Sequence, residues 1–361
     1  MFHNKQTTII IKRKLMKKLM LSLFVISLVF YSCNKNEDGL LNENNIKKSR
    51  KKVKAKRSFT GNEIQKNNEW TKVKTNTKER FNKIKFYGSI GYAVADKGIL
   101  FESLDWGENW YKVETGVTHN LRDISFSKDK YGDYLFKGVI NGLFTDNDGY
   151  TWTKKPESNY QRLHYNFYET MVSSNLGSNR ALIKRSNNDG KDWIDVEKKH
   201  IGNFTDFASN GTFIAATTWY PGNVFISGNR GLTWNRILKG DQKPAGSDLY
   251  FDDFLSVDFL DNKTVLVGGT HHILKSTNSG FSYKPIYETK ESSRFMVSSH
   301  PYYKNQIAAA TIGGEVLTSI DGGKTWKKEK ATDKRLTSIA ISSDYIVAVG
   351  EDGTIIRKKL F

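Results

Sequence analysis

Five arginines occupy equivalent places along the chain, and each stands beside an apolar residue at the start of a β-rich segment. The pairs are Arg80-Phe81, Leu121-Arg122, Arg162-Leu163, Arg294-Phe295 and Arg335-Leu336. A guanidinium group grips a carboxylate or a phosphate through two parallel hydrogen bonds, so such a cluster would recognise an anionic ligand. The structural alternative is that each arginine pairs with an acid or a backbone carbonyl at the end of its strand.

Acidic and imidazole side chains would offer a different chemistry. A glycoside hydrolase needs two carboxyl groups at a defined separation. Asp123, Asp206, Asp252 and Asp253 lie near the expected inner strands, but no spacing pairs them, and acids in such places are more often solvated or internally partnered. The pair His271-His272 hints at a metal site, yet no third ligand stands at a recognisable spacing. We therefore expect no metal, no cofactor and no catalytic residue.

One turn sequence that could position these residues occurs six times. Its pattern is Ser/Thr-x-Asp/Asn-x-Gly-x-x-Trp/Tyr, and successive terminal aromatics lie 42, 41, 41, 49 and 43 residues apart. The third-position residues are Asp105, Asn147, Asn188, Asn229, Asn278 and Asp321. Asparagine in four copies keeps the hydrogen-bond acceptor but loses the charge, which excludes a catalytic acid or a calcium ligand. The repeated residue is a structural turn residue.

The repeat predicts hairpins that join short strands. The third-position side chain can accept backbone N–H groups two residues on, asparagine there tolerates the left-handed region, and glycine at the fifth position supplies a positive φ. The terminal aromatic begins the next strand and buries a large ring. Short β-rich runs such as 90–96, 212–219 and 264–269 fill the intervals. Four strands in about 42 residues are typical of a β-propeller blade.

The two ends of the chain supply a further blade. Residues 336–358 align with the first three strands of a blade, and NEWTKV at 68–73 resembles the strand that follows each turn. Trp70 lies 40 residues before Trp110, in phase with the repeat. We predict a single all-β domain, residues 68–361, that forms a seven-bladed β-propeller closed by its N-terminal strand. Closure removes the unpaired strand edges that promote aggregation.

The turn resembles the Asp-box, or BNR repeat, of sialidases, sortilin-type receptors, xyloglucan hydrolases and photosystem II assembly factors, over the whole chain after about residue 66. This resemblance implies the propeller fold but not an activity, because many functions share the box. The Arg-Ile-Pro signature of sialidases is absent, and no Tyr/Glu pair can be placed by pattern. An arginine-rich face is a feature of the assembly-factor family.

The first 32 residues are typical of a signal peptide. Basic residues between Lys12 and Lys18 precede the apolar run 19–31, and Cys33 follows. The arrangement resembles a bacterial lipoprotein signal with Cys33 lipidated after cleavage; the alternative is a chance cysteine behind an ordinary signal peptide. Residues 33–67 are polar and include a block of eight basic residues at 47–57, which predicts a disordered basic tether.

Charge and cysteine content limit the class of partner. The net charge of +18 falls to +12 without the leader, and the tether accounts for half of that remainder. The expected propeller is only mildly basic, so we expect no nucleic-acid partner. With Cys33 as the single cysteine, disulfides cannot contribute to stability.

These observations favour a binding protein over an enzyme. We expect a monomeric, non-enzymatic, lipid-anchored propeller in the cell envelope of a Gram-negative bacterium, on either side of the outer membrane. It would bind an acidic protein segment at the arginine rim, near Trp219 and Tyr220, as an assembly or scaffold factor. The alternative is a carbohydrate-binding or glycan-active propeller, and an enzyme of this kind would be a glycoside hydrolase.

Overall fold

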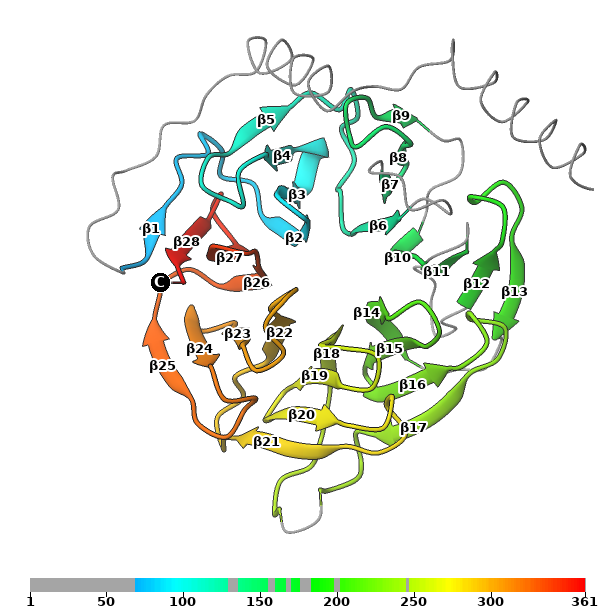
Figure 1. Cartoon of the computed structure of the whole chain (residues 1–361), viewed down its shortest axis with the longest axis vertical. Coiled ribbons are helices and arrows are strands. Elements are labelled where there is room, and N and C mark those ends of the chain that lie inside the picture. Colours follow the sequence, from blue (N-terminus) through cyan, green and yellow to red (C-terminus); the bar gives the residue numbers. More distant parts are fainter. Residues whose placement is uncertain are drawn as a thin grey trace, which may run out of the picture. The chain divides into compact units, whose positions relative to one another are not determined.

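The structure, a computed structural model, describes residues 69–360 apart from 129–135, 155–159, 167–169, 176–182, 198–201 and 245–246. Seven four-stranded antiparallel sheets surround a central axis (Figure 1), which confirms the all-β, seven-bladed propeller. The predicted signal peptide, Cys33 and the tether lie outside the described residues. Within the described part, no helix has the length and apolar character needed to cross a membrane.

The strands of each blade follow one another outward from the axis in chain order, except that the outermost strand of the last blade comes from the N-terminal end. The innermost strands are β2 (Phe81–Tyr87), β6 (Ile124–Lys128), β10 (Tyr160–Tyr165), β14 (Asn203–Ser209), β18 (Phe254–Phe259), β22 (Phe295–Ser299) and β26 (Leu336–Ile341). The second strands are β3 (Ile90–Ala95), β7 (Phe136–Ile140), β11 (Met171–Asn175), β15 (Ile214–Trp219), β19 (Val265–Gly269), β23 (Ile307–Thr311) and β27 (Tyr345–Gly350).

The outer half of each blade follows the same order. The third strands are β4 (Leu100–Ser103), β8 (Leu143–Thr145), β12 (Ile183–Ser186), β16 (Asn223–Ser227), β20 (His272–Ser276), β24 (Glu315–Ser319) and β28 (Ile355–Lys359). The outermost strands are β5 (Tyr111–Val113), β9 (Thr153–Lys154), β13 (Ile194–Glu197), β17 (Asn235–Lys239), β21 (Lys284–Glu288), β25 (Lys327–Lys330) and β1 (Thr71–Lys72). Among the described residues, one 3-10 turn, η1 (Asp96–Gly98), joins β3 to β4.

The ring closes as predicted, because β1 is the outermost strand of the last blade. The sheet order is β1-β28-β27-β26, with Thr71 opposite Arg357 and Lys72 opposite Ile356. The Val73 N–H then donates to the Ile355 carbonyl at 2.8 Å. The N-terminal strand thus covers an edge that the last three strands would leave unpaired.

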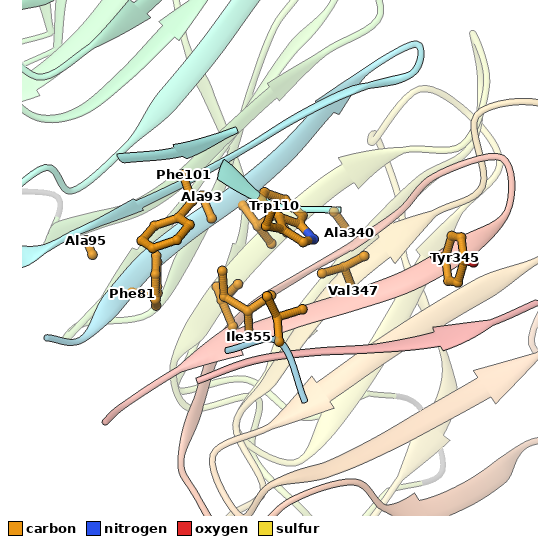
Figure 2. Packing of buried hydrophobic residues seen from close by; sticks show 12 residues of the cluster. Phe81, Ala93, Ala95, Phe101, Trp110, Ala340, Tyr345, Val347 and Ile355 are labelled. Carbon is orange, nitrogen blue, oxygen red and sulfur yellow. The ribbon is translucent and has the colours of Figure 1, made fainter. Parts of the chain in front are cut away.

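An apolar cluster fills the seam between the first and last blades. Phe101 and Trp110 come from the first blade, and Val347 and Ile355 come from the last (Figure 2); all four are fully buried. Burying an aliphatic or aromatic side chain of this size contributes about 1.5–3 kcal/mol. Val73, which directly follows β1, belongs to the same cluster, so the N-terminal segment contributes apolar packing to the closure as well as backbone hydrogen bonds.

The six repeated turns share one hydrogen-bond pattern, which differs from the expected one. The third-position oxygen accepts the N–H of the residue four positions on, as Asp105 does from Asn109 at 2.8 Å, and not two positions on. The same bond occurs at Thr151–Asn147, Asp192–Asn188, Thr233–Asn229, Ser282–Asn278 and Thr325–Asp321. The reason is that the fourth and fifth residues both have positive φ, for example 61° at Trp106 and 100° at Gly107, while the third does not.

Neighbouring innermost strands are linked through buried polar side chains. The Ser125 hydroxyl accepts the Tyr165 N–H at 2.9 Å, and the Ser256 hydroxyl accepts the Val297 N–H at 2.7 Å. These bonds satisfy backbone N–H groups that point toward the neighbouring blade instead of toward a strand in their own sheet. They also account for the polar residues that recur on the strands around the axis.

Candidate functional site

The structure brings all five arginines to one pocket at one mouth of the central channel. Each lies at or just before the start of an innermost strand. The pocket has a volume of about 240 Å³, and its charged lining residues are Arg80, Arg122, Arg162, Arg294, Arg335 and Glu351. The arginines come from the sixth, seventh, first, second and third blades, so they form a continuous arc. We call this group the arginine arc.

Two members of the arc, Arg80 and Arg335, have polar side-chain partners inside the protein. The Arg80 guanidinium donates to Asn82 Oδ1 at 2.9 Å and lies 3.9 Å from Asp96. Arg335 lies 3.8 Å from Glu351, and both side chains are about half exposed. Such long, exposed ion pairs contribute little stability and leave the cation accessible.

The remaining partners of the arc are backbone groups or aromatic rings. Arg162 donates to the Arg122 carbonyl at 2.9 Å, while its Nε is buried without a hydrogen-bond partner. Neither Arg122 nor Arg294 forms an ion pair with a described residue. The structural alternative for these arginines therefore holds only in part: the arc is incompletely neutralised by the protein's own acids.

An aromatic loop with Trp219 and Tyr220 follows the second strand of the fourth blade, which contributes no arginine to the arc. Trp219 is 44% exposed and lies under the Arg294 guanidinium, with 5.9 Å from the ring centre to Cζ. Tyr220 is 81% exposed, and its N–H donates to the Asp253 carboxylate at 2.9 Å. The connection from β17 to β18 packs against this loop, since the Gly240 N–H donates to the Gly222 carbonyl. Arginine and exposed tryptophan together are typical of protein-binding anchors.

The four aspartates considered as catalytic candidates each have a partner in the protein. The Asp123 carboxylate accepts the N–H groups of Ile124 and Leu163, at 2.9 and 3.1 Å. Asp252 lies 3.2 Å from the His271 ring. Asp253 orients the aromatic loop. These contacts are with backbone groups or with single side chains.

The two histidines considered as metal ligands also lack the arrangement that a metal needs. His272 is buried and lies 3.3 Å from Glu288, whereas His271 faces Asp252. Among the described residues no group of three or more His, Cys, Asp or Glu could hold a metal ion.

Asp206, the fourth candidate, has a partner that sequence reasoning missed. Its carboxylate accepts a hydrogen bond from the Lys83 ammonium at 2.7 Å, from the opposite side of the ring. Burial alone would raise the pKa of Asp206, but the charges of Lys83 and Lys85 outweigh it and hold the pKa below its ordinary value. The alternation Lys83-Ile84-Lys85 in an inner strand was the available signal, because i and i+2 side chains face the same way.

His164 stands on the neighbouring inner strand. Its ring nitrogens lie 3.3 Å from the Ser125 hydroxyl and 2.7 Å from the Ser209 hydroxyl. Burial, reinforced by the nearby Lys85, lowers the pKa of His164 to about 3. The ring is therefore neutral at physiological pH, and it links the hydroxyls of two blades.

Comparison with known proteins agrees with the expected family resemblance. No family model matches the chain. It is 24% identical over 286 residues to the photosystem II stability/assembly factor HCF136 of Arabidopsis thaliana, which covers 77% of this chain and 63% of that protein. It is 20% identical over 288 residues to the photosystem II assembly lipoprotein Ycf48 of Synechococcus, covering 76% and 70%.

A solved structure of YCF48 bound to a D1 peptide has the same fold. It superposes with a TM-score of 0.62 at 17% identity, covering 83% of this chain and all of that one. The chain is a distant homologue of these assembly factors, and its match spans less than two thirds of the Arabidopsis relative.

Proposed function

We propose that this protein is a non-enzymatic binding propeller whose arginine arc holds an acidic segment of a protein partner. The observation that carries the proposal is the composition of the pocket: five arginines and one acid, Glu351, line it. A guanidinium group binds a carboxylate through two parallel hydrogen bonds. Several guanidinium groups in one pocket can therefore bind several carboxylates of one acidic segment. The exposed Trp219 beside Arg294 would add apolar contact to the partner.

The distant relatives support the proposed class of activity. YCF48 has been solved with a D1 peptide, and both named relatives are assembly factors. By that homology the chain would bind a polypeptide and hold it during assembly of a complex.

We extend the proposal to the anchor and the compartment. Cleavage before Cys33 and lipidation of that cysteine would place a monomeric propeller at the envelope of a Gram-negative cell, joined to the membrane by the basic tether. The tether could rest on anionic head groups while the arginine arc remains free for the partner.

Fluorescence anisotropy with labelled peptides tests the binding proposal. The two probes alternate glutamate with serine and glutamine with serine, and they differ only in charge. The glutamate peptide should bind and the glutamine peptide should not. The double variant Arg122→Ala/Arg294→Ala should lose most of that affinity, whereas Arg236→Ala, an exposed arginine on the outermost strand β17, should keep it. Equal affinity for both peptides would overturn the proposal.

A further inference from the structure

A second pocket, of about 310 Å³, lies in the channel beyond the arginine arc. Its lining comes from residues further along the same inner strands: Asn82 and Thr205 line the arginine pocket, whereas Lys83 and Asp206 line this one. All inner strands run the same way along the axis, so the two pockets follow one another. They share no lining residue, and the Lys83–Asp206 pair stands at the junction.

The second pocket opens on the face opposite the arginine arc. Two of its lining residues are exposed: Gly88, between β2 and β3, and Pro301, between β22 and β23. Connections between first and second strands lie on the face that carries the repeated turns. The pocket is therefore a cup with its mouth on that face and its floor at Lys83 and Asp206.

The walls of the cup carry a positive and a negative side chain that do not form an ion pair with each other. Lys85 comes from the first blade and Asp258 from the fifth, and both line the pocket. No ion pair within 4 Å joins them, and Lys85 has no ion pair with any described residue. They nevertheless lie within electrostatic range, because the charge of Lys85 acts on the Asp258 carboxyl.

The carboxylate of Asp258 is held in place and partly desolvated. It accepts the Ser299 N–H and hydroxyl, both at 2.8 Å, and the Phe259 N–H at 3.0 Å. Burial raises the pKa of Asp258 despite these bonds, so a cation placed beside it would stabilise its charged form. The ammonium of Lys85 would correspondingly gain from a bound carboxylate.

Apart from His164, Ser209, Ser298 and Ser299, the rest of the wall is apolar. Val257, Val297, Ile339 and Ile341 line the same pocket. Small-molecule sites combine mostly apolar walls with a few convergent polar groups, and volumes near 300 Å³ stand at the lower end of their range. The cup therefore suits a small molecule with an anionic end, a cationic end and an apolar side.

We propose that this cup binds an apolar α-amino acid or dipeptide. The ligand's carboxylate contacts Lys85, its ammonium contacts Asp258, and its side chain packs on the valine and isoleucine wall. The site is separate from the arginine arc and does not depend on the function proposed above.

Isothermal titration calorimetry on the whole propeller tests this site with L-leucine and L-leucyl-L-leucine as probes. At least one should bind at up to millimolar concentration. Two analogues of leucine, 4-methylpentanoate without the ammonium and 3-methylbutylamine without the carboxylate, should each bind about tenfold or more weakly, because each loses one charged hydrogen bond. No heat with either probe, or equal affinity for either analogue, would overturn the proposal.

Variants locate the binding. Lys85→Met and Asp258→Asn should each weaken the affinity about tenfold or more. The matched controls Lys290→Met and Asp333→Asn alter exposed residues outside the pocket and should leave it unchanged. Thermal melts of every variant verify folding. Undiminished binding by folded Lys85→Met would contradict the assigned site.

Discussion

The Lys83 ammonium and the Asp206 carboxylate lie 2.7 Å apart, although one residue belongs to the first blade and the other to the fourth. Blades one and four stand on opposite sides of the seven-bladed ring, so the ion pair crosses the channel. Both side chains are largely buried, with 14% and 5% exposed. The pair lies between the arginine pocket and the second pocket. A partner segment at the arginine arc would therefore enter and leave by the same mouth, and would not thread through the ring.

The first prediction concerns this ion pair. Asp206→Ala would leave the Lys83 ammonium buried without its anion, and we expect a loss of about 3–5 kcal/mol in the free energy of unfolding. Lys83→Met should cost less than Asp206→Ala, because Asp206 would keep the N–H groups of Phe207 and Val257. Urea unfolding measures both.

An exposed pair provides the control for that prediction. Lys112 and Glu114 lie 3.1 Å apart with side chains 42% and 86% exposed, and Lys112→Met should change stability by no more than about 0.5 kcal/mol. If the buried and exposed variants lost the same stability, the ion pair across the channel would have no structural role.

The second prediction concerns acid stability. His164 has a pKa of about 3 in the folded protein, against 6.5 ordinarily. Below about pH 6.5 the unfolded chain takes up a proton that the folded protein refuses, so stability is full above that pH and falls as the pH is lowered toward 3. The slope from one such group approaches about 1.4 kcal/mol per pH unit.

His164→Gln removes the imidazole and keeps hydrogen-bonding capacity toward Ser125 and Ser209. The variant should therefore lose this part of the pH dependence between pH 6.5 and 5, where carboxylates contribute less. Denaturant titrations at several pH values give the difference between wild type and variant. A slope identical in both proteins would be inconsistent with a buried neutral His164.

The repeats made the architecture predictable from the sequence, whereas the contacts across the ring could not be predicted. Asp105 and its five counterparts recur in phase, and Trp70 continues that phase, so the blade number and the closing strand could be derived locally. Lys83 and Asp206 are 123 residues apart in the sequence. They meet because their inner strands face each other across a narrow channel, and the local sequence pattern does not contain that distance.

Local shifts in strand register hid other features. The pairing of β2 with β3 shifts between Phe81 and Lys83, which changes the side chains that face the channel. Arg122 and Arg294 could be assigned to one rim from their place ahead of inner strands. Their lack of an acidic partner could not, because it depends on side-chain contacts that the sequence pattern does not contain.

The third prediction concerns ring closure. Deleting the chain through Val73 removes β1, exposes the edge of β28 and opens the seam cluster around Trp110. We expect aggregation or a large drop in melting temperature. Deleting only 34–57, which includes the basic block, should leave the melting temperature nearly unchanged. Equal melting of the two truncated proteins would contradict closure by β1.

The fourth prediction concerns the proposed anchor. If Cys33 carries lipid, Cys33→Ala should move the protein out of the membrane fraction or leave its signal peptide uncleaved. Fractionation and intact-mass measurement of the expressed full chain distinguish the two results. Cys33→Ser is the conservative companion, since serine also cannot accept a thioether-linked lipid. A fully processed variant that stays in the membrane fraction would argue against lipidation at this cysteine.

The fifth prediction concerns the electrostatics of the arginine arc. Arg80 and Arg335 belong to adjacent blades, and their side chains are 51% and 56% exposed. Changing both to glutamate should weaken binding of the glutamate peptide by more than the sum of the two single alanine losses, because it replaces attraction with repulsion.

Binding of the glutamate peptide should also fall as the salt concentration rises, since exposed charges are screened beyond about 8 Å at physiological ionic strength. Each charge reversal also places a glutamate beside an acid, Asp96 or Glu351, so thermal melts verify that the double variant remains folded. Arg236→Glu on β17 adds the same repulsive charge away from the arc and serves as the control. Equal weakening by that control would mean that the peptide senses only net charge, and a specific acidic-segment site at the arc would then be excluded.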